Sequence, residues 1–177
     1  MALSDELGFL RPIEARAHEA VLSIFVTASL LGKEADRVLQ AFGLTQAQFD
    51  ILMLLRYQTA DGAADQTTLG RMLVVNRSNV TGLVDRMERD GLVTRVGDPA
   101  DRRVKRVRMT PAGARILERA GQAYAARTRE IVAGLTPVNL AALCRSLETV
   151  RAALREGLGP RKRRMSLAPL ARDRRNP

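Results

Sequence analysis

The stretch of sequence that decides the fold runs from Asn76 to Thr110 and reads NRSNVTGLVDRMERDGLVTRVGDPADRRVKRVRMT. Its first third predicts a helix, because apolar residues recur there at the i, i+3, i+4 and i+7 spacing of a helical stripe. Asn76 is a favourable N-cap for this helix. The apolar stripe consists of Val80, Leu83, Val84 and Met87. One side of the helix is therefore expected to be buried, and the other is left to meet a partner.

The exposed face of this helix is suited to entering the major groove of DNA. Its first half is small, polar and able to donate hydrogen bonds, whereas acidic residues gather in its second half, where phosphates would be repelled. Gly82 on this face costs about 1 kcal/mol of helix stability relative to alanine, a cost that close approach to DNA would justify. An ordinary surface helix is the alternative interpretation. The candidate DNA-contacting residues are Arg77, Ser78, Asn79, Thr81, Gly82 and Arg86.

A hairpin with an arginine-rich tip is predicted to follow the helix. Leu92-Val93 leads into a first strand, residues 97–99 (Gly-Asp-Pro) turn the chain, and residues 104–109 return with alternating polarity. In the returning strand the apolar residues are expected to face the core and the arginines to face solvent. The inward residues are Val107 and Met109, and the outward residues are Arg106 and Arg108.

The hairpin tip carries a second set of candidate DNA-contacting residues. Asp101 and Arg103 are two positions apart, so their side chains lie on the same side of an extended chain. A carboxylate there holds the guanidinium in one orientation, and an arginine held in this way loses less entropy on entering a narrow minor groove. The alternative is an exposed ion pair worth less than about 1 kcal/mol. The candidates at the tip are Asp101, Arg102, Arg103 and Lys105.

Before this stretch, the sequence predicts a long helix and two shorter ones. Pro12 favours a helix start and Gly43 a stop, which gives a first helix of about thirty residues. Residues 45–48 (Thr-Gln-Ala-Gln) match a capping box, and the next helix turns Phe49, Leu52, Met53 and Leu55 inward. Residues 59–66 are interpreted as a polar loop, followed by a short helix at about 68–74.

After Thr110 the sequence predicts two further helices. Pro111 begins a helix that runs to about Gly134, and Thr136-Pro137 begins another. Apolar residues in the last helix fall at the a and d positions of two heptads, which favours an apolar seam that pairs with another helix. We expect the first and last helices to form a dimer interface, and residues 159–177 to be disordered. The seam consists of Leu140, Leu143, Leu147, Val150 and Leu154.

The composition of the chain favours a polyanionic partner. The 177 residues carry a net charge of +10, and hydrophobic residues make up 46%, enough for a folded core. Residues 91–110 include six basic and two acidic residues, whereas residues 1–60 include five basic and seven acidic residues. A basic hairpin beside a slightly acidic N-terminal third indicates nucleic acid rather than a uniformly solvated surface.

Several features predict a cytoplasmic, soluble protein. The single cysteine precludes an intramolecular disulfide and indicates a reducing compartment. The N-terminal residues do not resemble a secretory signal, and the sequence contains no run of about eighteen apolar residues. Cys144 is expected to be a structural core thiol and His18 to pack against its neighbours, although His18 could also meet a ligand.

Three other classes of function fit the sequence less well. One histidine and one cysteine provide no cluster of metal ligands and no nucleophile–base set, so neither catalysis nor a cofactor is expected. A binder of RNA or single strands relies on exposed aromatic residues, and the sequence has 4 Phe, 2 Tyr and no Trp. A winged-helix module that contacts another protein is the remaining alternative. Duplex binding that weakens steeply with salt would separate it from a DNA-binding protein.

The run from Leu69 to Gly113 resembles the MarR family of winged helix-turn-helix transcriptional regulators. The family pattern joins a Val-Thr-x-Leu-Val-Asp-Arg helix, a Gly-Leu-Val strand start, an Asp-Pro-x-Asp-Arg-Arg wing and a closing x-Thr-x-x-Gly. In this sequence the last element departs mildly, since Met109 stands where leucine is usual. The four elements lie at residues 80–86, 91–93, 98–103 and 109–113.

The resemblance implies a mainly α fold with a small β-hairpin wing, in which a winged helix-turn-helix is flanked by dimerisation helices. The expected division is an N-terminal dimerisation helix, a DNA-binding domain, C-terminal dimerisation helices and a basic tail, at residues 13–44, 45–113, 114–158 and 159–177. It also implies a homodimer, expected to act as a repressor, on a pseudo-palindromic duplex, with Arg103 in the minor groove supported by Asp101. A small aromatic or carboxylate effector often releases DNA in this family, whereas the cysteine of its oxidant sensors, near the start of the first helix, is missing here.

Overall fold

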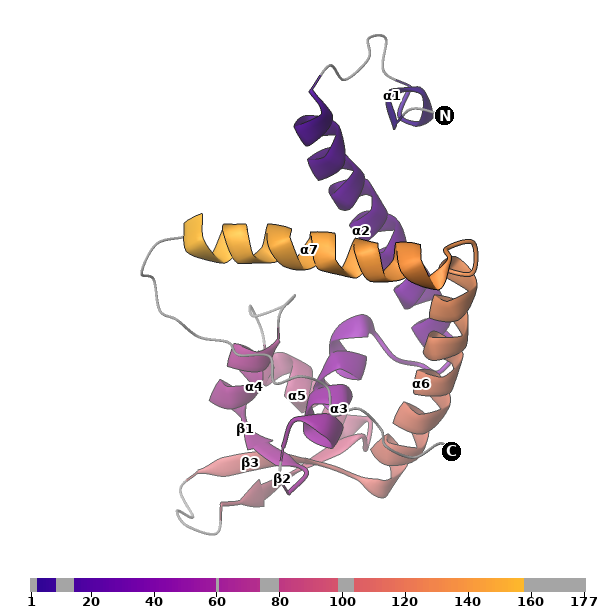
Figure 1. Ribbon diagram of the computed structural model, residues 1–177. Helices are drawn as coiled ribbons and strands as arrows, with labels where there is room; N and C mark the ends of the chain where they lie inside the picture. The colour runs from indigo at the N-terminus through magenta and orange to yellow at the C-terminus, as the bar shows by residue number, and fades with distance from the viewer. Residues whose placement is uncertain (1–2, 9–14, 60, 74–79, 99–103, 158–177) are drawn as a thin grey trace. The chain divides into compact units, whose positions relative to one another are not determined.

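The computed structural model describes residues 3–8, 15–59, 61–73, 80–98 and 104–157 of the chain (Figure 1). The chain divides into two compact units, Met1–Gln46 and Ala47–Pro177. The first unit contains α1 (Leu3–Glu6) and α2 (Arg16–Gln40). The second contains α3 (Gln46–Tyr57), β1 (Ala63–Asp65), α4 (Gln66–Met72), α5 (Val80–Arg89), β2 (Val93–Gly97), β3 (Lys105–Met109), α6 (Pro111–Ile131) and α7 (Pro137–Gly157). The prediction of a mainly helical chain with a small sheet is confirmed.

The long helix of the first unit ends where the sequence predicts. Gly43 has a φ of +69°, a conformation that glycine adopts without steric cost. Its amide donates to the carbonyl of Gln40 and the amide of Leu44 donates to that of Leu39, so the last turn is closed by two hydrogen bonds. The helix contains 25 residues, fewer than the thirty expected, and the predicted start at Pro12 lies outside the described residues. His18 is exposed in the chain, so the expectation that it packs is wrong.

A three-stranded antiparallel sheet lies at the centre of the second unit, in the order β1-β3-β2. Val107 of the middle strand is fully buried and pairs with Ala64 on one side and Arg95 on the other. The apolar faces of α3 and α5 supply most of the remaining core. The core residues include Ile51, Leu52, Leu55, Leu69, Val84, Met87 and Val93, all at most 1% exposed. The stripe predicted on the helix after Asn76 therefore does anchor that helix.

The interpretation of residues 59–66 as a polar loop is wrong, because this segment contains strand β1. Ala63 and Ala64 are 2% and 5% exposed, and they pair with Arg108 and Val107 of β3. A three-residue strand of small side chains has no alternation to reveal it in the sequence. The helix that follows the strand, α4, begins at Gln66, before the start predicted at about residue 68. Asp65 caps α4 by accepting a hydrogen bond from the amide of Thr68 at 2.8 Å.

The turn between α5 and β2 explains the Gly-Leu-Val pattern. Gly91 has a φ of +70°, and its amide donates to the carbonyl of Glu88. The amide of Leu92 donates to the carbonyl of Met87, which completes the hydrogen-bond pair of a Schellman motif. Leucine at this position is 4% exposed, so the turn also anchors the end of the helix in the core.

The junction between β3 and α6 explains the Thr-x-x-Gly pattern. The hydroxyl of Thr110 accepts from the amide of Gly113 at 3.0 Å and donates to the carbonyl of Gly91 at 2.6 Å. A Cβ atom added to Gly113 would lie 2.2 Å from the carbonyl oxygen of Leu92. Threonine therefore caps the helix, and glycine allows the helix to approach the β2 backbone.

The last helix, α7, contains no buried residue in the isolated chain. Leu143 and Leu154 of the predicted seam are 44% and 61% exposed. The expectation of a core thiol is wrong, since Cys144 is exposed on the same helix. None of the described helices combines the length and apolarity needed to cross a bilayer.

Candidate nucleic-acid interface

The described half of the candidate interface consists of α5 and the two strands of the wing. The buried residues of α5 hold one face of the helix against the core, which leaves its other face outward. Thr81 and Arg86 are exposed there, and Gly82 is half-buried. Lys105 is exposed at the start of β3, where the amide of Asp98 donates to the carbonyl of Val104 and closes the hairpin. The structure thus places four of the candidate residues on a helix and hairpin of the same unit.

The remaining candidate residues lie outside the described part of the chain. They are Arg77, Ser78 and Asn79 before α5, and Asp101, Arg102 and Arg103 at the wing tip. The same holds for the predicted cap Asn76 and for the tail at 159–177. Their roles in DNA contact stay predictions that follow from the sequence.

A hollow of about 640 Å³ brings parts of the helix and the wing together. Thr81 contributes from α5 and Lys105 from β3, and the hydroxyl of Thr81 lies 3.4 Å from the amide oxygen of Gln66 at the start of α4. The other lining residues are Asp65, Thr67, Arg95 and Val104. The hollow is therefore lined by the start of α4, the outer side of α5 and the wing.

Arg95 joins the wing to α5, the candidate recognition helix, and this contact was not predicted from the sequence. Its guanidinium donates hydrogen bonds to the carboxylates of both Asp85 and Glu88, which are three residues apart on α5. Its backbone amide also donates to Glu88 at 2.7 Å. The hydrogen bond from this backbone amide, together with the one from the guanidinium, lowers the pKa of the Glu88 carboxyl below its usual value. The Glu88 carboxylate is therefore charged at neutral pH.

Arg106 was expected to face solvent, but the structure places it in a second ion-pair network. Its guanidinium donates to both carboxylate oxygens of Asp61, at 2.6 and 2.8 Å, and to the carbonyl of Ala63 at 2.6 Å. Asp98 lies 3.6 Å from the same guanidinium. The hydrogen bond from Arg106 lowers the pKa of the Asp61 carboxyl. Only 20% of the Arg106 side chain is exposed, compared with 48% for Arg108, so the two outward arginines differ in availability.

The third acidic residue at the end of α5 also has a partner. The side-chain amide of Gln48 donates to the carboxylate of Asp90 at 3.4 Å, and Gln48 is 6% exposed. The sequence predicts Gln48 as part of a capping box with Thr45, whereas in the structure its side-chain amide is directed to Asp90. The carboxylates of the recognition helix are thus all paired with other side chains, which softens the repulsion that the sequence alone predicted.

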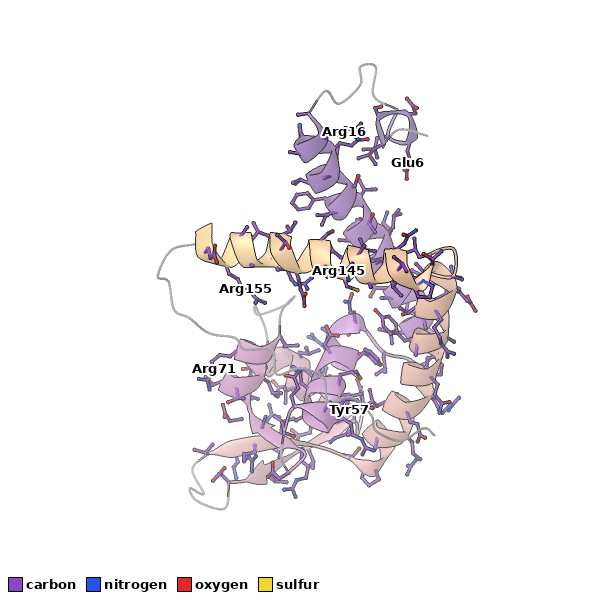
Figure 2. The ribbon with its side chains drawn as sticks, in the orientation of Figure 1. Glu6, Arg16, Tyr57, Arg71, Arg145 and Arg155 are labelled. Carbon is purple, nitrogen blue, oxygen red and sulfur yellow. The ribbon has the colours of Figure 1, made fainter. Side chains whose placement is uncertain are left out.

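A second hollow, of about 600 Å³, lies between α3 and α6. Phe49 and Tyr124 form its aromatic wall, with ring centroids 5.5 Å apart. Met53, predicted to point inward, lines this hollow and is half-buried. Arg56 and Tyr57 contribute from the end of α3, where Figure 2 shows the Tyr57 side chain, and Arg115 and Glu118 contribute from α6. No cluster of three or more metal-ligating side chains occurs in the described ranges.

The arrangement of α4, α5 and the β2–β3 hairpin defines a winged helix-turn-helix protein. Residues 44–105 match the model of the MarR family. The chain is therefore similar to the MarR family over this segment. The expectation that it is a regulator rather than an enzyme agrees with the names of its relatives, which are transcriptional regulators.

Relatives and solved structures agree with this assignment. The chain is 38% identical over 102 residues to the transcriptional activatory protein BadR of Rhodopseudomonas palustris, a match that covers 58% of each chain. It is 31% identical over 106 residues to the transcriptional repressor YetL of Bacillus subtilis, covering 60% of this chain and 63% of YetL. The chain thus matches about three fifths of the length of these relatives. The MarR regulator Sco3205 of Streptomyces coelicolor, solved in complex with DNA, has a TM-score of 0.69 and 27% identity, covering 86% of this chain and 94% of that one.

Proposed function

We propose that the protein regulates transcription by binding a pseudo-palindromic DNA duplex as a homodimer. The observation that carries this proposal is the two-sided character of α5, whose apolar face is buried while its polar face, with Thr81 and Arg86, is outward beside a basic hairpin. A helix of this kind fits the major groove, and a hairpin that follows it reaches the neighbouring minor groove. The solved DNA complex of Sco3205 supports the same use of the domain.

The proposed homodimer rests on the exposure of α7. A helix of 21 residues with no buried residue carries an apolar seam of leucines and valine along one side. Exposed apolar stripes of this regularity are covered by a partner helix in stable proteins. A second copy of the chain supplies such a helix and places two winged helix-turn-helix domains on one duplex. In a two-fold symmetric reader the half-sites lie about 10 base pairs apart.

We propose repression as the direction of regulation, by analogy with YetL. BadR is named as an activatory protein, so relatives of this chain act in both directions. The direction depends on where the bound duplex lies relative to the promoter.

The hollow between α3 and α6 is our candidate effector site. Its aromatic wall of Phe49 and Tyr124 suits a flat apolar ring, and Arg56 and Arg115 offer cations for a carboxylate or phenolate. Its volume of about 600 Å³ falls within the range of small-molecule sites. Addition of benzoate should weaken duplex binding in a fluorescence-anisotropy titration, with acetate at equal concentration as the ionic control. Equal effects of the two anions would contradict this assignment.

The wing arginine provides a direct test of DNA binding. Substitution of Arg103 with alanine should weaken duplex binding by about 1–3 kcal/mol, because it removes a cation from the minor groove. Arg155→Ala is the matched control, since it removes an exposed arginine from α7, outside the reading head (Figure 2). Equal affinities of the Arg103→Ala and unsubstituted proteins would contradict the proposed wing contact. Binding that does not weaken as salt is raised would contradict duplex binding altogether.

A further inference from the structure

The recognition helix presents a conflict that its own sequence does not resolve. Asp85 lies on its outward face with Thr81, and the Asp85 side chain is 52% exposed. Glu88 lies one turn further along and is 35% exposed. Two carboxylates on a helix that approaches phosphates would oppose binding, because like charges repel over a Debye length of about 10 Å at moderate salt.

The wing supplies the charge that opposes these carboxylates. Arg95 follows the buried Val93 by two residues in strand β2, so both side chains point to the same face of the sheet, toward α5. Its guanidinium donates to Asp85 and to Glu88, and its side chain is 26% exposed. One cation is therefore shared between two anions, at the boundary between helix and wing.

We propose that Arg95 is a positioning residue for DNA binding, which masks the carboxylates of Asp85 and Glu88 and so allows the recognition helix to approach the phosphates. The same two ion pairs connect β2 to α5 and hold the wing beside the helix. This inference rests on the proposed DNA binding and assigns a role to a residue that need not contact DNA itself.

The geometry supports masking over a role as a free phosphate ligand. An arginine whose two terminal nitrogens already donate to carboxylates has its positive charge offset by those carboxylates before DNA approaches. The hydrogen bond to Asp85, with a further hydrogen bond to Glu88, raises the pKa of the Arg95 guanidinium, so this group stays positively charged. Lys105 lines the same hollow and is more exposed than Arg95, so it is the cation better placed for phosphate contact.

Removing the cation with and without the two carboxylates separates masking from the other roles. Arg95→Gln should weaken duplex binding about ten-fold at low salt, with a smaller loss at high salt, because it uncovers two carboxylates. The combination Arg95→Gln/Asp85→Asn/Glu88→Gln removes one cation together with two anions, so it should bind at least as tightly as the unsubstituted protein. Fluorescence anisotropy at two salt concentrations measures these affinities, and Arg155→Gln is the matched control. A triple variant as weak as Arg95→Gln would overturn masking in favour of direct phosphate contact or a purely mechanical tie.

A second variant keeps the proposal testable if Arg95→Gln does not fold, which thermal unfolding would show. Asp85→Asn/Glu88→Gln retains Arg95 and releases its charge, so it should bind duplex about three-fold more tightly at low salt. Unchanged or weaker binding by this double variant would overturn the proposal. Failure of the proposed function looks different, since the unsubstituted protein would then show no salt-dependent binding in the first titration.

Discussion

Replacement of Gly113 with alanine should destabilise the protein by about 3 kcal/mol, because the new methyl group meets backbone that has little freedom to move. The added Cβ would lie 2.2 Å from the carbonyl oxygen of Leu92 and 3.2 Å from the Met109 side chain. That carbonyl also accepts from the backbone amide of Thr110 at 3.0 Å, so moving it breaks a second contact. Urea denaturation, with the free energy of unfolding extrapolated to water, measures the effect.

Gly121→Ala is the matched control on the same helix. A Cβ at Gly121 would have no neighbour within 4 Å, so alanine there should be neutral or raise stability by up to about 1 kcal/mol through its better helix propensity. If both substitutions shift the unfolding midpoint by the same small amount, the close packing of α6 on β2 is contradicted. A large loss at Gly113 alone would explain why the Thr-x-x-Gly pattern closes the domain.

Substitution of Leu147 with aspartate should convert the proposed dimer to monomers and weaken duplex binding about 100-fold or more. A charge in the middle of the seam must be desolvated for two α7 helices to pair, and loss of pairing removes the gain from two linked half-site contacts. Sedimentation velocity measures the oligomeric state, and the duplex titration measures the affinity.

Ser146→Asp is the control for this experiment, because it places the same charge on the neighbouring exposed residue of α7, outside the seam. This variant should remain dimeric and should bind duplex with nearly the original affinity. Leu147→Asp protein that still sediments as a dimer would show that the seam has been assigned wrongly. The proposed function would then need a different interface.

The sequence predicts those parts of the fold that depend on local periodicity. The stripe from Val80 to Met87 identifies α5, and the residues that form it are buried or half-buried in the structure. Gly43 identifies a helix stop because its positive φ is a local requirement. In the same way Pro111 marks the start of α6. These features can be predicted from the sequence because neighbouring residues alone determine them.

The parts that the sequence did not predict depend on contacts between distant residues. Strand β1 is held by its pairing with β3, more than forty residues away, and its small side chains carry no pattern of their own. The half-buried state of Arg106 depends on Asp61, which is a similar distance away along the chain. Cys144 is exposed on α7, and helical spacing alone does not show which face of that helix is covered.

The candidate site shows the same division between local and distant signals. The polar face of α5 is visible in the sequence, but the role of Arg95 requires knowledge of how β2 packs against α5. The sequence does contain one signal for this contact. Arg95 lies two residues after the buried Val93, on the same face of the strand. The preceding helix carries two carboxylates three residues apart, on one of its faces. Such a pattern predicts a salt bridge only once the strand and helix are known to be adjacent.

The most direct test of the account is selection of bound duplexes from a random-sequence library by the full-length protein, followed by sequencing. A symmetric reader predicts enrichment of an inverted repeat whose half-site centres lie about 10 base pairs apart. The Leu147→Asp variant should lose enrichment of the paired half-sites. Recovery of unrelated sequences, or of a single half-site by the unsubstituted protein, would contradict the claim that this chain reads DNA as a two-fold dimer.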